Sequence, residues 1–368
     1  MSTNQRAITA TYMRGGTSKG MFFHARDLPP AGPERDELLL RIMGSPDPLQ
    51  IDGMGGTYSS TSKVVVVDEP NDGELTYWFG QVAINAPHID WNGNCGNLTT
   101  AVGPFVLDEG LVQGHDPVTR VTLHNENTGT KIEAEVPTSN STFRVDGEHV
   151  VDGVPGTGSP VVTRYLDPAG KTTGSLLPTG DATTQVALAS GEQLWVSVVD
   201  AASVFAFIRA EDLGVDMSQT DVSVLNADAE LLERIEETRA RLAVQLGRVN
   251  DPADAATESA TVPRIIVFGP GDNEVMVHAR AVMMGVFHRA LPMTGALCLA
   301  AAAHTPGTLV AEALTEPTAR EVIIGHPRGQ AVVDVDATTD DHETRIKSLG
   351  VTRTARRIMD GNVYVPEA

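Results

Sequence analysis

The chain has few cysteines and few aromatic residues. Of its 368 residues only two are cysteine, Cys95 and Cys298, and aromatic residues make up 5%. Two distant cysteines without a Cys-x-x-Cys pair form neither a disulfide framework nor a zinc site. This usage favours a reducing compartment, so we expect a cytoplasmic protein. With so few aromatics, the core has to be built from Val, Ala, Leu and Ile.

Cations and long apolar runs are scarce as well. Lys and Arg total 27 against 48 Asp and Glu, which gives a net charge of −21. Such a balance argues against nucleic acid and anionic membranes as partners. No apolar run approaches the roughly 20 residues of a membrane span. The opening M-S-T-N-Q-R-A-I-T-A-T-Y also lacks the basic and apolar regions of a signal peptide.

Signatures of metal and nucleotide sites are missing too. H-E-x-x-H does not occur, the histidines show no metal spacing, and no G-x-G-x-x-G follows a predicted strand. The glycine-rich residues 13–20 do not match the Walker pattern. We therefore expect neither a metal nor a cofactor.

Short β-branched runs bounded by turn residues are present along the whole chain and predict strands. They lie at residues 63–68, 118–123, 161–165, 194–199, 204–208, 264–268 and 322–324. Helices are fewer, and the clearest are residues 32–43 and the amphipathic residues 227–246. The Ala- and Asp-rich residues 251–260 predict a mobile loop.

Two further helical segments resemble each other. Residues 97–110 and 294–303 lie in opposite halves, and each follows a polar or glycine-containing turn. Small apolar residues on every side predict a helix that is buried all round. We expect each to be a central helix wrapped by a sheet, in two similar domains, with a boundary in residues 177–189.

The first candidate site is M-R-G-G-T-S-K-G, which follows a strand-like run. Glycines allow close backbone approach, and backbone N–H groups, hydroxyls and cations can donate hydrogen bonds to an anion. A solvated hairpin turn is the alternative interpretation. The candidate anion-binding residues are Arg14, Gly15, Gly16, Thr17, Ser18 and Lys19.

The second candidate is Lys63, which lies between a Gly/Ser/Thr loop and four valines. Desolvation at such a strand start, and neighbouring cations, would disfavour the charged ammonium. A neutral lysine can serve as a general base. An exposed strand-end lysine is the commoner alternative.

The third candidate is Cys95 in D-W-N-G-N-C-G-N-L. A cysteine at a helix N-terminus faces unpaired N–H groups and the positive end of the helix dipole, which favours the thiolate. The same N–H groups can hold a carboxylate. A small buried hydrophobe is the alternative for Cys95, and it is the preferred interpretation for Cys298, inside L-C-L-A-A-A-A. Two weaker candidates are His288 and His326, each followed closely by an arginine.

These motifs, with G-S-P-D-P-L-Q-I-D-G-M-G-G, S-S-T-S-K, A-V-G-P-F and G-H-P-R-G, resemble the PrpF family from about Ala7 to Pro366. The resemblance implies the diaminopimelate-epimerase-like α/β fold, with two similar domains, each a mixed sheet around a central helix, and a site in the cleft between them. We accordingly expect domains at residues 1–185 and 186–345, with residues 346–368 packing back on the first.

The resemblance also implies cofactor-independent isomerisation of a small unsaturated di- or tricarboxylate such as 2-methylaconitate, aconitate, methylitaconate or oxalomesaconate. Lys63 and Cys95 match the family's catalytic pair, and the Arg14–Lys19 loop matches its carboxylate loop. Ser60, Ser62, Asn94, Gly96, Asn97, Thr294 and Gly295 complete the expected substrate-binding residues.

Related epimerases use a second cysteine just before the position of Thr294, where this chain has Pro292 and Met293. A two-thiol racemase is therefore disfavoured. The alternatives left open are cis–trans isomerisation or double-bond migration, a 4-oxalomesaconate tautomerase specifically, and a non-catalytic carboxylate-binding accessory protein of a dehydratase. Which of Lys63 and Cys95 is the base is also open, and a homodimer is expected.

Overall fold

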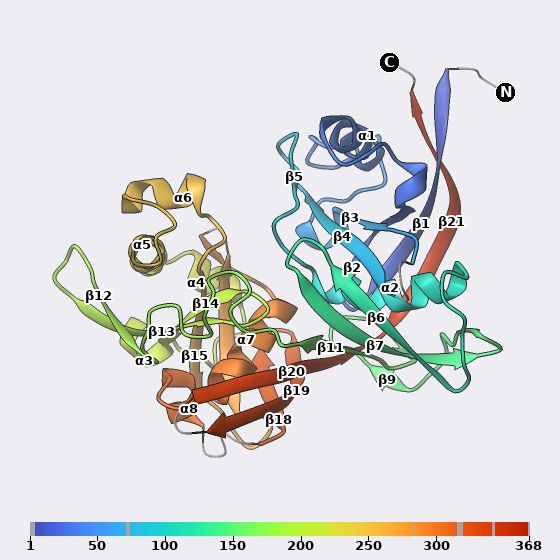
Figure 1. The fold of residues 1–368 in the computed structure, drawn as a ribbon. Helices are drawn as coiled ribbons and strands as arrows, with labels where there is room; N and C mark the ends of the chain where they lie inside the picture. Colours follow the sequence, from blue (N-terminus) through green and yellow to red (C-terminus); the bar gives the residue numbers. More distant parts are fainter. Residues whose placement is uncertain (1–3, 71–73, 284, 315–318, 341–342, 367–368) are drawn as a thin grey trace. The chain divides into compact units, whose positions relative to one another are not determined.

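The computed structural model describes residues 4–70, 74–283, 285–314, 319–340 and 343–366. The chain divides into two compact units (Figure 1). Unit 1 comprises Met1–Arg164 and Thr352–Ala368, and unit 2 comprises Tyr165–Val351. Both units combine helices with parallel and antiparallel strand pairs, so the predicted α/β class is confirmed.

The units begin and end at other residues than the sequence suggested. The chain leaves unit 1 between Arg164 and Tyr165, inside strand β11 (Val161–Leu166). It returns between Val351 and Thr352, inside strand β20 (Glu343–Arg353). The expected boundaries were residues 185 and 345. Because the chain changes units inside continuous strands, no proline- or glycine-rich loop marks either crossing.

Unit 1 is built from strands that surround one long helix. Its elements are β1 (Gln5–Gly15), β2 (Ser18–His24), η1 (Ala25–Asp27), α1 (Pro33–Met43), η2 (Ser59–Thr61), β3 (Lys63–Val67), β4 (Leu75–Val82), β5 (Ile89–Asp90), α2 (Gly96–Asp108), β6 (Val118–Asn125), β7 (Thr130–Ser139), β8 (Thr142–Phe143), β9 (His149–Val150), β10 (Thr157–Gly158) and β21 (Ala355–Pro366).

The strands of unit 1 are paired through segments far apart in the sequence. β21 runs antiparallel along the whole of β1, and the two lie side by side in Figure 1. β1 also forms a hairpin with β2, β2 pairs parallel with β3, and β3 pairs antiparallel with β4. This order places the start of β3 beside the β1–β2 hairpin, where the candidate residues lie.

Alternation along β3 assigns the two faces of this sheet. Val64 and Val66 pack in a core cluster with Leu38, Leu39 and Ile42 of α1. Successive strand residues point to opposite faces. Lys63 and Val65 therefore face the other side, where α2 lies: Tyr77, on the Lys63 face of β4, has its hydroxyl 2.8 Å from Thr99 Oγ1 of α2.

Helix α2 is the predicted central helix of unit 1. The sequence placed it at residues 97–110, and the helix spans Gly96–Asp108. From Gly96 to Leu107 every residue except Asn97 is buried. A helix that is apolar on all sides needs such a complete cover. The one less buried residue of this stretch belongs to the candidate site.

Unit 2 has its own central helix, α7. Its elements are β12 (Thr184–Ala187), β13 (Gln193–Asp200), β14 (Val204–Arg209), α3 (Ala210–Leu213), α4 (Val222–Asn226), α5 (Ala229–Gln245), η3 (Pro252–Asp254), α6 (Ala255–Glu258), β15 (Arg264–Pro270), β16 (Val277–Met283), β17 (Val286–Phe287), α7 (Met293–Ala303), α8 (Leu309–Ala313), β18 (Glu321–His326) and β19 (Gly329–Asp340).

All eleven residues of α7 are buried, as its composition predicted. The amphipathic helix α5 contributes Leu231, Ile235 and Leu242 to a separate cluster with strand residues such as Val196. The expected mobile loop at residues 251–260 is wrong, because η3 and α6 occupy most of it. Asp251 accepts a hydrogen bond from the Ala253 amide, and this cap starts η3.

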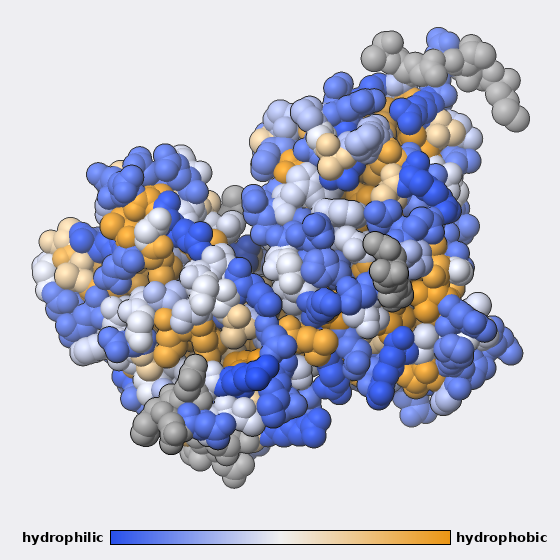
Figure 2. Space-filling model, in the orientation of Figure 1, coloured by the Kyte–Doolittle hydropathy of each residue, from blue (hydrophilic) through white to orange (hydrophobic). Residues whose placement is uncertain are grey.

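The surface drawn in Figure 2 is largely hydrophilic. On the face drawn in Figure 2, hydrophilic residues cover most of the area and apolar residues appear in scattered groups. Isolated exposed hydrophobic residues such as Leu49, Ile51 and Tyr58 are normal on a folded protein. Among the described residues, no helix is both long enough and apolar enough to cross a membrane.

Candidate active site

The M-R-G-G-T-S-K-G motif forms the β1–β2 hairpin. Arg14 pairs with Lys19 and Gly15 with Ser18, which leaves Gly16 and Thr17 as the two-residue loop. Gly16 has φ +48°, a conformation that glycine adopts without steric cost. The hairpin interpretation and the anion-site interpretation are therefore compatible, because the anion-binding groups would lie at a hairpin tip.

The hairpin tip lies directly on the first turn of α2. A Cβ atom at Gly15 would lie 2.1 Å from the Asn97 carbonyl oxygen, and one at Gly16 would lie 2.1 Å from Asn97 Oδ1. Asn97 Nδ2 donates to Thr17 Oγ1 at 3.0 Å and approaches Ser18 Oγ at 3.5 Å. Both glycines are thus required for this approach, which brings the loop hydroxyls to the start of the helix.

Arg14 stabilises the hairpin from below the tip. Its Nη1 donates to the Gly16 carbonyl at 3.0 Å and to the Thr354 carbonyl at 2.8 Å. The Gly16 amide donates to the same Thr354 carbonyl at 2.9 Å. Burial, and then the nearby Arg356 guanidinium, lower the pKa of Arg14. Its usual value is so high that the side chain stays charged, and it contributes positive potential at the tip.

Lys63 is a buried lysine at the first position of β3. Only 7% of its surface is exposed, so the exposed strand-end alternative is wrong. Its Nζ donates to Gln81 Oε1 and lies 4.9 Å from the centroid of the Phe79 ring. Gln81 in turn donates to the Ser62 carbonyl at 2.9 Å and to the Ser59 carbonyl at 3.1 Å. The amine is therefore held by an oriented amide and an aromatic face.

The serines before Lys63 differ in how far their hydroxyls are available to a substrate. Ser62 is fully buried; its hydroxyl donates to the Val82 carbonyl at 3.0 Å and accepts from Gln50 Nε2 at 2.8 Å. These two bonds engage Ser62 in the protein interior and hold the start of β3 in place. Ser60 lies in η2 and is half-buried, so its side chain is nearer the solvent.

Cys95 is the N-cap residue of α2, with an extended backbone and a half-buried side chain. Its amide donates to Asn94 Oδ1 at 2.7 Å. The hydroxyls of Tyr77 and Thr99 lie 3.2 and 3.1 Å from the same oxygen. Asn94 Nδ2 is shielded from solvent and has no hydrogen-bond partner among the described residues. The residue before Cys95 thus carries a shielded donor that has no partner in the described part of the chain.

One face of β4 connects the two candidate catalytic groups. Tyr77, Phe79 and Gln81 alternate along the strand and therefore share a face. Gln81 and Phe79 contact the Lys63 amine, while the Tyr77 hydroxyl approaches Asn94, the residue before Cys95. None of the three was predicted as a site residue, although their spacing of two residues in L-T-Y-W-F-G-Q-V is a strand signal.

The candidate residues of the second half belong to unit 2. Thr294 and Gly295 lie in the first turn of α7 and are buried. His288 Nδ1 lies 3.2 Å from the Ala290 amide nitrogen, and His326 Nδ1 accepts from the Arg328 amide at 3.2 Å. A ligand role for these four residues stays a prediction.

Cys298 is a core residue, which confirms the interpretation from its sequence context. The side chain is 0% exposed and its Sγ lies 3.2 Å from the Val199 carbonyl oxygen. Burial raises the pKa of this thiol far above its ordinary range. Pro292 and Met293 occupy the N-cap and first position of α7. A reactive second thiol is therefore absent from the start of this helix.

Side chains suited to a metal ion do not gather anywhere in the described ranges. No group of three or more His, Cys, Asp or Glu residues there has a geometry that could hold one. The candidate active site instead provides hydrogen-bond donors, the Lys63 amine and the Cys95 thiol.

Comparison with characterised proteins gives three relatives that match almost end to end. The chain is 37% identical to 3-methylitaconate isomerase of Eubacterium barkeri, over 100% of this chain and 99% of the relative. It is 36% identical to 2-methyl-aconitate isomerase of Cupriavidus necator, over 98% of both. It is also 36% identical to 4-oxalomesaconate tautomerase of Pseudomonas putida, over 98% of this chain and 97% of that protein.

Solved structures agree on the fold. Methylitaconate-delta-isomerase superposes with a TM-score of 0.85 at 36% identity, covering 99% of this chain and 97% of the other. A hydroxyproline epimerase from Agrobacterium vitis superposes with a TM-score of 0.62 at 13% identity, covering 98% and 93%, and this likeness shows the fold alone. The expected epimerase-like architecture is confirmed.

The family assignment follows from the whole length of the chain. The family model described as PrpF protein matches residues 5–366. This range contains nearly all of unit 1 and the whole of unit 2, with the β1–β2 hairpin, Lys63 and Cys95. The chain belongs to the PrpF family.

Proposed function

We propose that this protein is a cofactor-independent isomerase of a small unsaturated di- or tricarboxylate, of the 2-methylaconitate, methylitaconate, aconitate or oxalomesaconate type. The observation that carries the proposal is the shared face of β4, which supports Lys63 through Gln81 and Phe79 and the Cys95 turn through Tyr77. An amine and a thiol supported by one strand suit proton transfer at a substrate carbon. The similarity to isomerases and a tautomerase of such acids supports the substrate class.

The substrate carboxylates bind at the junction of the hairpin and α2. The first turn of a helix has N–H groups without intrahelical partners, and they attract anions. Asn94 Nδ2 is an additional donor beside this turn, and the Thr17 and Ser18 hydroxyls lie at the hairpin tip. Arg14 and Lys19 add positive charge. These groups provide a local positive potential in a protein of net charge −21.

In the proposed reaction Lys63 and Cys95 form the acid–base pair. One of them, as the amine or thiolate base, takes a proton from an allylic carbon of the substrate. The electron pair of that C–H bond delocalises through the double bond into the carboxylate as a dienolate, which the N–H groups stabilise. A proton then returns to the far end of the delocalised three-carbon system, a carbon of the original double bond, which moves the double bond. Alternatively it returns to the same carbon after rotation, which exchanges cis and trans. No atom is gained or lost.

The direct test is turnover in deuterated water. Purified protein is incubated separately with 2-methylaconitate, trans-aconitate, oxalomesaconate and methylitaconate, and each mixture is followed by proton NMR. We expect deuterium incorporation or a double-bond shift with at least one acid. If none reacts while an acid still raises the melting temperature, the protein is a carboxylate-binding accessory protein instead.

The Lys63→Met variant tests the assignment of the pair. Removing a general acid or base typically lowers the rate about 10²–10⁴-fold, and we expect a loss of this size in kcat. Lys131→Met is the matched control, because Lys131 is exposed and pairs with Glu74 outside the site. Full activity of Lys63→Met on a confirmed substrate would overturn the role of Lys63.

Sedimentation of the purified wild-type protein tests the expected homodimer, and fractionation of cells tests the expected cytoplasmic location.

A further inference from the structure

Asn127 lies at the tip of the β6–β7 hairpin and uses its whole side-chain amide inside the protein. Oδ1 accepts from the Phe79 amide at 2.7 Å and from Asn125 Nδ2 at 3.1 Å. Nδ2 donates to the Phe79 carbonyl at 3.1 Å and to the Trp91 carbonyl at 2.5 Å. An amide has two donors and two acceptor sites. All four are occupied, in contrast to Asn94, whose Nδ2 has no partner among the residues that the structure describes.

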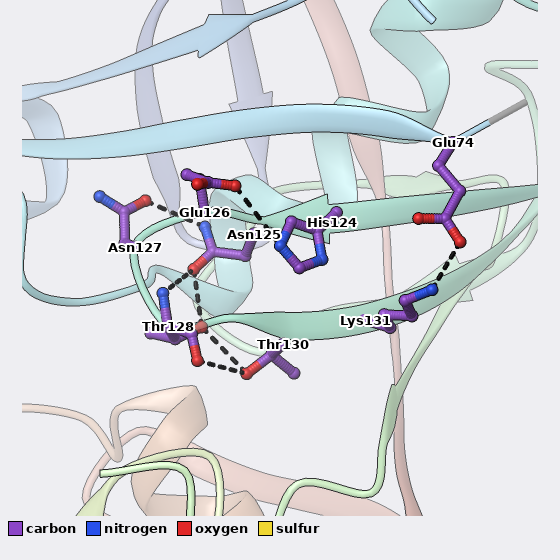
Figure 3. Close-up of polar contacts among 8 residues, drawn as sticks. All are labelled: Glu74, His124, Asn125, Glu126, Asn127, Thr128, Thr130 and Lys131. Atoms are coloured by element: carbon purple, nitrogen blue, oxygen red, sulfur yellow. Dashed lines mark hydrogen bonds and ion pairs between the residues drawn. The ribbon is translucent and has the colours of Figure 1, made fainter. Parts of the chain in front are cut away.

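Asn127 fills a gap in the hydrogen-bond ladder of β4. One edge of β4 pairs with β3 from Tyr77 to Gln81. On the other edge β6 pairs with Leu75–Tyr77 and β5 pairs with Gln81 and Val82. Phe79 lies between these two partners, and the Asn127 amide bonds both its N–H and its carbonyl, as a strand would. Figure 3 shows the turn from which Asn127 extends and the Asn125 amide bonded to it.

The two residues that Asn127 holds belong to the two halves of the candidate site. The Phe79 ring lies 4.9 Å from Lys63 Nζ. Trp91 begins the short segment that leads to Cys95, and the other end of this segment is fixed at Asn94 by Tyr77 and Thr99. Without Asn127, the Trp91 end loses this bond to its carbonyl, and the backbone of Phe79 loses its bonds on that edge.

We propose that Asn127 is a positioning residue that sets the distance between Lys63 and Cys95. The inference rests on the proposed function, because it assumes that these two groups transfer the proton. Asn127 acts through Phe79 and Trp91, so its loss lowers kcat and leaves KM little changed. Asn127 bonds Phe79, Asn125 and Trp91, and none of these residues belongs to the tip of the β1–β2 hairpin with its carboxylate-binding groups, so substrate binding should be retained.

The experiment compares Asn127→Ala and Asn127→Asp with Thr128→Val. Thr128 lies in the same turn, where its hydroxyl donates to Asn125 Oδ1 at 2.7 Å (Figure 3). In the described ranges its hydrogen bonds stay within the turn, so it controls for a loosened hairpin. Asn127→Asp keeps an acceptor for the Phe79 amide and loses the donor to both carbonyls. It also serves as the second variant if Asn127→Ala does not fold.

Two measurements are made on each protein. The first is kcat and KM on the acid that the wild type converts. We expect kcat to fall about 10- to 100-fold in both Asn127 variants, the size expected for a small misplacement of reacting groups, with KM within about threefold. Thr128→Val should keep kcat within about twofold. Wild-type kcat in the Asn127 variants, or an equal loss in Thr128→Val at the same melting temperature, would overturn the proposal.

The second measurement needs no substrate. Alkylation of Cys95 by iodoacetamide is timed by mass spectrometry, with the buried Cys298 as an internal unreactive reference. The rate should change severalfold in the Asn127 variants and stay at the wild-type value in Thr128→Val; an unchanged rate contradicts the proposal. If the wild type converts no acid, the proposed function fails, while the alkylation rates still decide whether Asn127 positions the Cys95 turn.

Discussion

The two central helices, α2 and α7, look alike in sequence and differ in what their cysteines can do. Cys95 is the half-buried N-cap of α2, and the preceding residue, Asn94, has a shielded Nδ2 without a partner in the described ranges. Cys298 is the sixth residue of α7 and is fully buried, with its Sγ 3.2 Å from the Val199 carbonyl oxygen. A shift from the cap to the second turn therefore converts a candidate reactive thiol into a core side chain.

The difference extends to the residues around each helix start. Polar groups surround the first turn of α2: Asn94 and Thr99 beside the cap, and Asn97 under the hairpin. The first turn of α7 begins with Pro292 and Met293, and its members are buried. Helix ends attract anions in general, but the start of α2 also carries side-chain donors. The two units thus share an architecture, while the cysteine at a helix start belongs to α2 and the cysteine of α7 lies in the core.

The largest expected effect is a difference in kcat between variants of the two cysteines. Cys95→Ala should lower kcat about 10²–10⁴-fold, because it removes one member of the proposed acid–base pair. Cys298→Ala should retain kcat within about twofold, since this thiol is far from ionising and lies in the core. Both variants are assayed by NMR on the acid that the wild type converts. If both lose activity equally at the same residual stability, the contrast between the helices is wrong.

The next largest effect is expected on the free energy of unfolding, when a glycine beside α2 and a glycine inside α7 are each replaced by alanine. A Cβ at Gly15 would lie 2.1 Å from the backbone oxygen of Asn97, so Gly15→Ala forces the hairpin off the helix. We expect a loss of about 1–3 kcal/mol in the free energy of unfolding, as for other overpacked sites.

Gly295→Ala is the matched variant. A Cβ at Gly295 would meet the ends of the Ile266 and Phe205 side chains at 3.2 and 3.3 Å, which can adjust. Alanine also favours a helix by roughly 0.5–1 kcal/mol over glycine, so we expect a change within about 1 kcal/mol. Urea unfolding measures both variants. A larger loss at Gly295 than at Gly15 would show that the hairpin does not need its close approach to α2.

Local patterns predicted most of the fold. The buried helices α2 and α7 follow from apolar residues on every side, and the strand runs follow from β-branched clusters. The unit boundaries did not follow, because β11 and β20 cross them as continuous strands. The helical turns at residues 252–258 were missed because an Asp cap in an Ala-rich stretch was interpreted as a loop.

Residues of the candidate site could be predicted only where the local sequence around each of them is distinctive. The hairpin, Lys63 and Cys95 each lie in a distinctive local sequence. Their supports come from elsewhere: Gln81 and Tyr77 from β4, Thr354 from the C-terminal segment, and Asn127 from a hairpin tip. Such contacts depend on strand pairing between distant segments, and nothing in the local sequence of Asn127 indicates its partner.

The smallest expected effect concerns Cys298 and the stability of the protein at alkaline pH. In the unfolded chain a cysteine thiol ionises with a pKa of about 8.5, whereas burial raises the pKa of Cys298 in the folded protein. The folded state therefore retains the proton more tightly. The thiol's contribution to stability is complete below about pH 8.5 and is lost as the pH rises, by up to roughly 1.4 kcal/mol per pH unit.

Cys298→Ala removes this ionisation, so between pH 8 and about pH 10.5 its free energy of unfolding should fall less steeply than that of the wild type. The cavity left by the substitution lowers stability by the same amount at every pH, whereas thiol ionisation changes the slope. Urea titrations across this range therefore separate the two effects. Equal slopes of the unfolding free energy against pH in the two proteins would mean that the Cys298 thiol ionises as readily in the folded as in the unfolded protein. The distinction between a capping cysteine and a core cysteine would then rest on the activity of the two cysteine variants alone.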